Sequence, residues 1–309
     1  MIINASARTD IPAFFCEWFF HRLKEGYVYV RNPYYPTQIT KYLLNPDVVD
    51  SIIFCTKNPH PMLSRLSELK DYHPYFFVTI TPYGKDIEPL VPPYLDVIND
   101  ILILSQQLGS QSVGIRYDPI FIDSHYTIEK HIQAFDEITK QLEGYVHECI
   151  ISFIDLYAKT KKNFPNIQEV SLDNQRLIAK AFVKIATPRG IHMRTCAESL
   201  DLSEYGITHE GCINQQLLKN VIGYSLKDKK VQPLRQHCSC YPSRDIGEYN
   251  TCLHGCLYCY ANEDKQKVID NYHRHDPLSP LLIGHVHSED IIKQAKQESY
   301  IERQLSLDI

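Results

Sequence analysis

The sequence predicts an α/β protein in which a parallel sheet, forming a partial or complete β/α barrel, is surrounded by helices. Two observations support this fold class. Short β-rich runs alternate with longer amphipathic or capped stretches along the chain, and this β-then-α alternation repeats about six times. Successive units of this kind favour parallel strands with the helices outside. A doubly wound open sheet is the alternative arrangement of the same units.

The individual elements follow from local composition. Strands are expected where β-branched and aromatic residues gather, at residues 1–6, 49–56, 74–81, 112–118, 148–155 and 190–196. Helices are expected between them, at residues 12–26, 61–70, 94–109, 127–143 and 172–186. Asp10 is a suitable N-cap for the first helix, and Pro12 suits its first turn. A hairpin-like insert of residues 27–33 and 38–44 is expected after that helix.

Composition and length bound the class of protein. The chain has 309 residues, 44% of them hydrophobic, which is enough for a full-size core. The sequence predicts a barrel domain at residues 1–200 and a cysteine-rich region at 201–309 that packs on the barrel mouth. No leader-like segment or long apolar run is seen, so a cytoplasmic location without membrane contact is expected. The net charge of −5 gives no global attraction to nucleic acid.

Three cysteines near the C-terminus form the most specific motif. Residues 251–262 read TCLHGCLYCYAN, which gives Cys252, Cys256 and Cys259 a C-x3-C-x2-C spacing, with Tyr258 directly before the third cysteine. Three thiolates on one short loop can hold three irons of a 4Fe-4S cubane and leave the fourth iron open to a substrate or cofactor. Zinc is the alternative metal, because thiolates and a nearby imidazole also suit it.

Four further cysteines lie upstream of this loop and suggest a second metal site. They are Cys196, Cys212, Cys238 and Cys240. Four thiolates complete either an auxiliary 4Fe-4S cluster or a tetrahedral zinc site, and both alternatives remain open, as does a set of ordinary buried thiols. The three remaining cysteines lie in apolar segments and are expected to pack as small hydrophobic residues: Cys16, Cys55 and Cys149.

Polar side chains recur where the predicted strands end. In parallel β/α folds ligands bind at the carboxyl ends of the strands, so these groups are expected to meet at one mouth and to hold a charged ligand. The candidate catalytic residues are Lys57, Arg116, Asp118, Asp155 and Glu198.

The motifs taken together resemble a family of proteins. The segments SARTDIPAF, GYVYVRNP, FCTKNP, TITPYG, RYDPI, ISFIDLY, TCAE and YNTCLHGCLYCYAN, within residues 2–262, are similar to an uncharacterised bacterial and archaeal family of radical S-adenosylmethionine (SAM)-like iron–sulfur proteins. Ordinary radical SAM enzymes carry the three-cysteine loop after their first barrel strand, whereas here it follows the sixth predicted strand.

This resemblance implies an enzyme that cleaves SAM reductively and acts on a substrate that the sequence does not identify. It implies a 4Fe-4S cluster and SAM as cofactors, and an electron donor such as flavodoxin or ferredoxin as a partner. Arg116 or Lys57 would then bind the SAM carboxylate, and Asp118, Asp155 or Glu198 its amine or ribose hydroxyls. The alternative function is a zinc- or iron–sulfur-binding barrel protein without radical chemistry, either a hydrolase or a nucleic-acid-associated repair protein.

Overall fold

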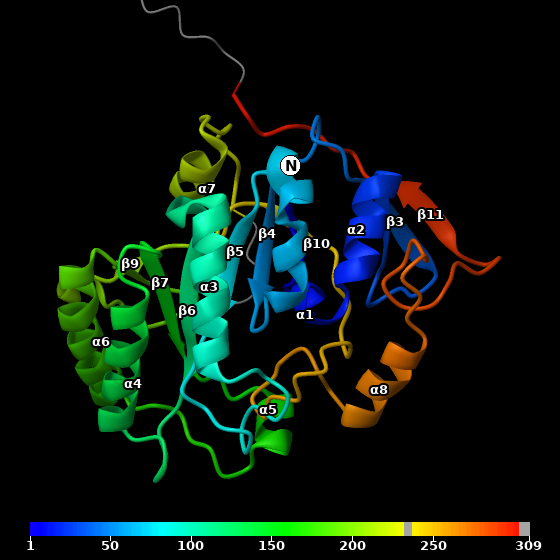
Figure 1. The fold of residues 1–309 in the computed structure, drawn as a ribbon. Coiled ribbons are helices and arrows are strands. Elements are labelled where there is room, and N and C mark those ends of the chain that lie inside the picture. The colour runs from blue at the N-terminus through cyan, green and yellow to red at the C-terminus, as the bar shows by residue number, and fades with distance from the viewer. Residues whose placement is uncertain (232–236, 303–309) are drawn as a thin grey trace, which may run out of the picture.

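A computed structural model describes residues 1–231 and 237–302 and shows an α/β protein built on one large sheet (Figure 1). The sheet has eight strands in the order β10-β1-β4-β5-β6-β7-β8-β9, and every neighbouring pair is parallel. Its strands are β1 (Ile2–Asn4), β4 (Ser51–Thr56), β5 (Tyr75–Thr79), β6 (Val113–Ile120), β7 (Glu148–Phe153), β8 (His192–Thr195), β9 (Thr208–His209) and β10 (Ser243–Asp245).

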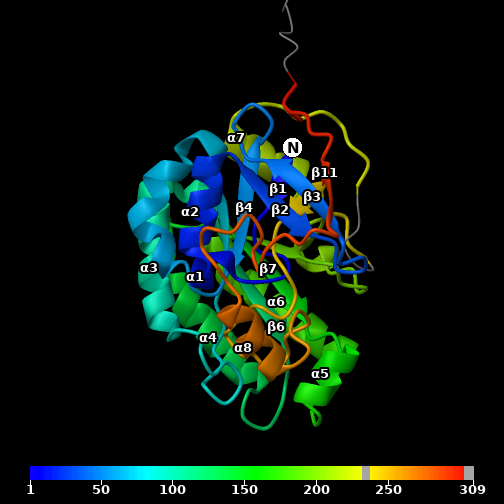
Figure 2. The same cartoon turned by 90° about the vertical axis from the view of Figure 1, so that its right-hand side faces the viewer.

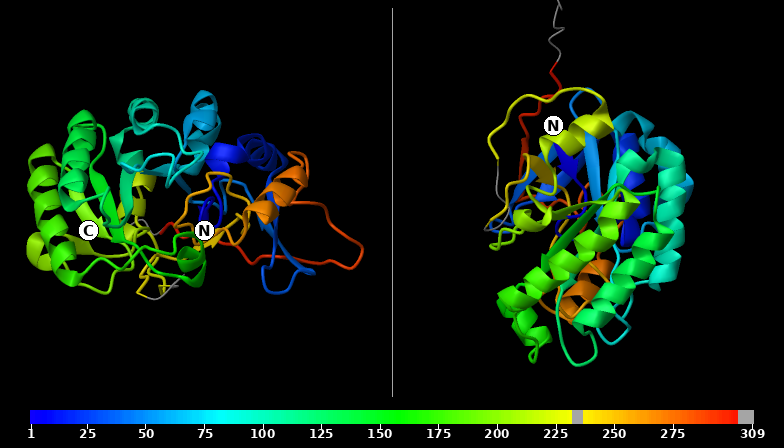
Figure 3. Two further views of the ribbon diagram at one scale, coloured as in Figure 1. Left: turned by 90° about the horizontal axis from the view of Figure 1, so that it is seen from below. Right: turned by 90° about the vertical axis from the view of Figure 1, so that its left-hand side faces the viewer.

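Helices fill most connections between these strands. The α-helices are α1 (Ile11–Phe14), α2 (Cys16–Glu25), α3 (Tyr94–Leu108), α4 (Ile128–Gln141), α5 (Ala158–Asn163), α6 (Leu172–Ala186), α7 (Gln215–Ile222) and α8 (Lys265–His273). The 3-10 helices are η1 (His60–Tyr72), η2 (Ser110–Ser112), η3 (Thr187–Arg189) and η4 (Ser203–Tyr205). Seen from below, the helices that follow the strands form an arc on one side of the sheet (Figure 3).

The two faces of the sheet carry different cores. Because side chains alternate along a strand, Phe54, Phe76 and Ile115 point toward the helices and join the main hydrophobic cluster. Ile53, Phe77 and Ile150 point to the other face and pack with α7 and with the segments that carry the four upstream cysteines. The second face is therefore covered by the C-terminal third of the chain.

The six strands expected from the sequence are all present, and their parallel pairing confirms an α/β protein with a parallel sheet. Two expected helices differ in detail. The first breaks into α1 and α2 at Phe15, although Asp10 caps it as expected by accepting a hydrogen bond from the Ala13 amide at 3.1 Å. The stretch at residues 61–70 winds as the 3-10 helix η1, which starts after Pro59 and contains Pro61 in its first turn.

The sheet does not close through hydrogen bonds between the described strands, because β9 and β10 form its two edges. Both edge strands come from beyond residue 200 and were not foreseen, since runs of two or three residues give no periodic signal. Residues 201–309 thus contribute strands to the main sheet in addition to the cysteine-bearing loops. Within the described ranges, no helix is both long and apolar enough to span a bilayer.

A second, three-stranded sheet lies beside the N-terminal helices (Figure 2). The expected hairpin is formed by β2 (Tyr27–Arg31) and β3 (Gln38–Leu43), which pair antiparallel. The C-terminal strand β11 (Ile291–Gln294) then adds in parallel to β3.

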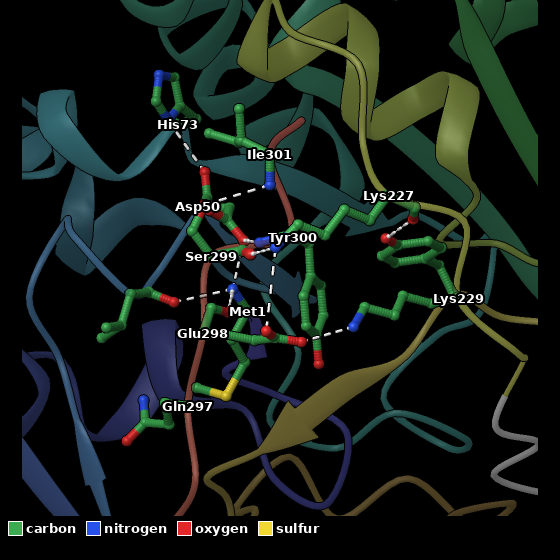
Figure 4. A network of polar contacts seen from close by, with 12 residues as sticks. Met1, Asp50, His73, Lys227, Lys229, Gln297, Glu298, Ser299, Tyr300 and Ile301 are labelled. Carbon is green, nitrogen blue, oxygen red and sulfur yellow. Dashed lines mark hydrogen bonds and ion pairs between the residues drawn. The ribbon is translucent and has the colours of Figure 1, made fainter. Parts of the chain in front are cut away.

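After β11 the chain returns to the main sheet, where Asp50 fastens it (Figure 4). The buried Asp50 carboxylate forms an ion pair with the amine of Met1, and it accepts hydrogen bonds from the Ser299 hydroxyl at 2.6 Å and the Tyr300 amide at 2.7 Å. One side chain thus holds β1, the start of β4 and the C-terminal segment together.

We expect Asp50→Asn to lower the free energy of unfolding by about 3 kcal/mol, because it leaves a buried ammonium without its carboxylate. Chemical denaturation checks this value. Asp47→Asn, which removes an exposed carboxylate three residues away, serves as the control and should change the stability by less than about 0.5 kcal/mol. Equal effects of the two substitutions would show that the Asp50 contacts contribute nothing.

Candidate functional site: two groups of cysteines

The three-cysteine loop lies at the carboxyl ends of the parallel strands, directly after β10. The Leu90 amide donates to the carbonyl of His254, and the Leu257 amide donates to the carbonyl of Ile87, at 3.0 and 3.1 Å. Gly255 permits the turn between the first two cysteines, because its φ of 73° is in the left-handed region. The backbone of the loop is therefore held against the segment that follows β5.

Asp10 and His254 attach the loop to the ends of β1 and β4. His254, between the first two cysteines, is 2% exposed, and its Nε2 lies 2.9 Å from the Asp10 carboxylate. The same carboxylate accepts hydrogen bonds from the Thr56 hydroxyl at 2.7 Å and from the Lys57 amide at 2.8 Å. Asp10 is therefore both a helix cap and the central acceptor at the mouth.

A buried carboxylate, Glu88, forms a second polar centre next to the loop. Its Oε1 accepts from the ammonium of Lys57 at 2.9 Å, from the Thr81 hydroxyl at 2.8 Å and from the Tyr258 hydroxyl. Burial opposes the charge of Lys57, but Glu88 and then Cys256 raise its pKa above the ordinary value, so Lys57 is a cation beside the second cysteine. Burial also raises the pKa of Tyr258, which stays protonated and donates to Glu88.

The three loop thiols lie near one another in this enclosed setting. Burial is the main cause that raises the pKa of each thiol. Cys252 and Cys256 are raised further by their neighbouring loop cysteines, whereas Lys57 acts in the opposite direction on Cys256 and Cys259. Such an arrangement disfavours bare thiolates and suits a positively charged partner that neutralises them.

The four upstream cysteines also come together, on the face of the sheet that packs against α7. The Cys212 and Cys240 sulfurs are 3.3 Å apart, Cys196 forms a hydrogen bond with Cys212, and Cys238 forms one with Cys240. The bond from Cys196 lowers the pKa of Cys212, but the bond to Cys240 and burial raise it, to about 12 overall. The four thiols thus form a second cysteine group, as the sequence led us to expect.

Two features bring the segments of this second group together. Arg194 is buried, forms an ion pair with Glu148 at 2.5 Å and donates to the carbonyls of Gly211 and Cys212 at 2.9 and 3.1 Å. A Cβ atom on Gly211 would lie 2.5 Å from the carbonyl oxygen of Ser239 and 2.7 Å from the Cα of Cys240. Only glycine allows these two backbone segments to approach so closely.

Arg116 and Asp118 form an ion pair within electrostatic reach of the second cysteine group. The Asp118 carboxylate accepts from Nε and Nη2 of Arg116, at 3.0 and 2.5 Å, and from the Ser152 hydroxyl at 3.3 Å. Burial opposes the charge of Arg116, but Asp118, Cys196, Cys212 and Cys55 raise its pKa well above the ordinary value. The expected strand-end pair is present, and the guanidinium faces the second cysteine group.

The remaining predicted residues have local partners. The Glu198 carboxylate accepts from the Phe153 amide at 2.9 Å, just at the end of β7. Asp155 is exposed and accepts from the Tyr157 hydroxyl at 3.1 Å. Among the predicted site residues, Lys57 and Tyr258 form one set beside the loop, and Arg116 with Asp118 forms another.

Tyr260 connects the two sets. Its hydroxyl donates to the carbonyl of Ala7 at 2.6 Å, while its ring stays half exposed. Burial of the hydroxyl raises its pKa, and Cys259 and then Cys55 raise it further, which places Tyr260 within electrostatic reach of both. Cys55 in turn lies near Cys196 and Cys240, so it borders the second cysteine group besides packing in the core as expected.

Glu88 and His254 were not recognised as site residues in the sequence. Glu88 lies in an irregular segment nine residues after the end of β5, where no strand end or spacing marks it. His254 stands between two cysteines and was considered only as a ligand alternative, whereas its imidazole binds Asp10. The position of His254 between two loop cysteines was the feature of the sequence that could have marked it as a site residue.

Several nearby cysteines can thus bind an iron–sulfur cluster. In the described parts of the chain, no three or more His, Cys, Asp or Glu side chains form a group that could hold a single metal ion. A cubane does not require such convergence, because each thiolate ligates a different iron. The donor chemistry of both cysteine groups fits thiolate-ligated clusters.

Comparison with known proteins identifies the family of this chain but finds no relative whose function is established. A family model described as a domain of unknown function, DUF1848, matches residues 2–261, so the chain belongs to this family. No curated protein and no solved structure matches the chain.

Proposed function

We propose that this DUF1848 protein is a radical SAM-type enzyme that holds an open 4Fe-4S cluster on Cys252, Cys256 and Cys259. The observation that supports this most strongly is the setting of the loop. Three neighbouring, half-buried thiols lie at the carboxyl ends of parallel strands, surrounded by a buried cation and two carboxylates.

The position of the loop in the sheet also supports the proposal. In the chain, the loop follows β10 and lies far from the first strand, β1. In space, β10 pairs in parallel with β1 at the edge of the sheet. Because β10 is the edge strand, the loop follows the first strand when the strands are counted in space from that edge. Ordinary radical SAM enzymes carry their three-cysteine loop after the first barrel strand.

Cys252, Cys256 and Cys259 would hold the cubane, which would supply the electron for reductive cleavage of SAM. The protein holds the loop in place through Asp10, His254 and Glu88, and it offers Lys57 as the cation for a carboxylate. The bond from Tyr258 to Glu88 fixes the loop between its second and third cysteines. The ring of Tyr258 then separates this site from the aromatic cluster of Tyr83 and Phe121.

We assign the second cysteine group to an auxiliary cluster. Its four thiols and the adjacent Arg116 suit a centre that carries negative charge, since a buried anion needs a nearby cation. Zinc would use the same thiolates, and metal analysis distinguishes the two.

The proposal is tested on protein reconstituted anaerobically with iron and sulfide. We expect a brown protein with about seven to eight irons per chain, which forms 5′-deoxyadenosine when dithionite and SAM are added. A colourless protein that binds only zinc, or a brown one that forms no deoxyadenosine, would refute the radical function. The first of these results would instead favour a zinc protein without radical chemistry.

Substitutions at the two candidate cations locate the SAM carboxylate. We expect Lys57→Gln to weaken SAM binding by about tenfold or more, because Lys57 lies beside the loop, and to leave the iron content unchanged. Arg116→Lys keeps the positive charge but loses the paired N–H donors of the planar guanidinium. We expect this substitution to alter the spin signal of the auxiliary cluster more than it alters the affinity for SAM. Calorimetric titration of SAM checks both, and the reverse order of effects would assign the carboxylate to Arg116.

A further inference from the structure

A row of exposed tyrosines borders the mouth at which the three-cysteine loop lies. Tyr34 and Tyr35, in the connection between β2 and β3, are 83% and 63% exposed. Tyr260 follows the third loop cysteine and is 51% exposed, and Tyr157, at the start of α5, is 39% exposed. Figure 2 shows α5 and the β2–β3 connection on the same side of the molecule.

Between Tyr249 and Tyr157, cations lie beside the tyrosines. Tyr249, just before the loop, has the guanidinium of Arg8 at 5.6 Å and the ammonium of Lys159 at 5.3 Å from its ring centroid. Lys159 donates to the carbonyl of Tyr260 at 3.2 Å, and the rings of Tyr260 and Tyr157 are 6.4 Å apart.

This row, which we call the tyrosine rim, carries both cations and carboxylates. Helix α5 carries Lys159 together with Lys161 and Lys162, both of which are exposed. Among the carboxylates nearby, Asp245 forms an ion pair with Arg8, and Glu263 forms one with Lys267 at 2.8 Å. The exposed Asp155 accepts a hydrogen bond from the Tyr157 hydroxyl at 3.1 Å. The net charge of −5 in the sequence therefore gives no measure of the potential at this surface.

We propose that the tyrosine rim binds single-stranded nucleic acid and presents one nucleotide to the mouth. Aromatic rings stack on unpaired bases without regard to sequence, and flanking lysines and arginines bind the phosphates. This inference deepens the proposed function. It rests on that function because the presented nucleotide is taken to be the substrate of the radical site.

The pairing of aromatic rings with cations favours a nucleic acid over a protein partner. A single strand repeats one charged and one aromatic group at every nucleotide, and the rim places the exposed rings of Tyr157 and Tyr260 beside α5, which carries the exposed Lys161 and Lys162. A protein partner, such as an electron donor, would recognise a basic patch without requiring exposed rings beside it. Rings that stand as far out as Tyr34 offer both faces for stacking.

Fluorescence anisotropy on the full chain, loaded with its metal centres, tests the proposal with labelled oligothymidylate of about 12 nucleotides. The first variant is Tyr34→Ala with Tyr35→Ala, and the second is Lys161→Gln with Lys162→Gln. The controls are Tyr224→Ala, a tyrosine that is 61% exposed beside α7, and Lys180→Gln with Lys184→Gln on the exposed side of α6. Oligouridylate in parallel distinguishes DNA from RNA as the ligand.

We expect wild type to bind the single strand more tightly than a duplex of the same length, because only unpaired bases can stack on the rim. The double tyrosine variant should lose at least about tenfold in affinity. The double lysine variant should lower the slope of log affinity against log salt by about 1.4, or about 0.7 for each lost phosphate contact. The controls should match wild type.

Absence of binding to both oligonucleotides, equal losses in the controls, or variants that weaken only the binding of reduced flavodoxin would each overturn the proposal. The last result would make the rim a docking surface for an electron donor. The assay needs neither SAM nor reductant. Loss of this inference therefore leaves deoxyadenosine formation as an independent test of the radical function.

Discussion

Replacing Cys252, Cys256 or Cys259 by Ala is expected to reduce 5′-deoxyadenosine formation to the background measured without protein. Each thiolate holds a different iron, so the loss of one breaks the three-point attachment that leaves a fourth iron open. The fold should persist, since the loop lies at the mouth outside the main hydrophobic cluster, and the free energy of unfolding should change by less than about 1 kcal/mol. Anaerobic turnover with dithionite and SAM, followed by chromatography, gives the rate.

Cys16→Ala is the matched control for this prediction. It removes a buried thiol on α2 whose sulfur contacts the carbonyl of Pro61, away from both cysteine groups. Turnover by this variant should equal that of wild type. Deoxyadenosine formation that survives in the triple variant lacking all three loop cysteines would show that the second cysteine group, and not the loop, carries the chemistry.

Gly211→Ala is expected to empty the second cysteine group and to leave the loop cluster intact. The added methyl would overlap the backbone of Ser239 and Cys240, so the segments that carry Cys212 and Cys240 must move apart. Overpacking of this kind costs about 1–3 kcal/mol, and the displaced sulfurs no longer fit one centre. If both groups hold cubanes, the iron content should fall from about eight to about four per chain.

Iron analysis and the spin signal of the reduced protein check this expectation. Ser239→Ala changes an exposed residue of the same segment without adding atoms, and it should keep the full metal content. If Gly211→Ala loses both centres together, the two groups depend on each other. If it loses none, the close approach of the two segments is not needed for metal binding.

The fold was predictable where the sequence repeats a pattern over many residues. The strands from β1 to β8 and the helices α3, α4 and α6 alternate regularly, and their apolar positions follow strand or helix periods. The edge strands β9 and β10 are too short to show a period, and their pairing depends on contacts with distant strands. The η1 segment has a helical pattern of apolar residues, but prolines at its start accompany a 3-10 geometry.

The site was predictable in its cysteines and only in part in its polar residues. The spacing of the loop and the recurrence of polar residues at strand ends identified Lys57, Arg116 and Asp118. The sequence could not indicate which charges neutralise one another, such as the pairing of Arg116 with Asp118 and of Lys57 with Glu88. Glu88 was missed because its role depends on three residues from different parts of the fold.

The pairing of β10 with β1 has a further meaning for how the protein is assembled. The strand that precedes the cysteine loop is the last of the main sheet in the sequence, yet in space it lies beside the first strand. During synthesis the strands from β1 to β8 leave the ribosome before any loop cysteine does. The scaffold that supplies Asp10, Lys57 and Glu88 is thus made first, and the cysteines reach a mouth whose other walls have already been synthesised.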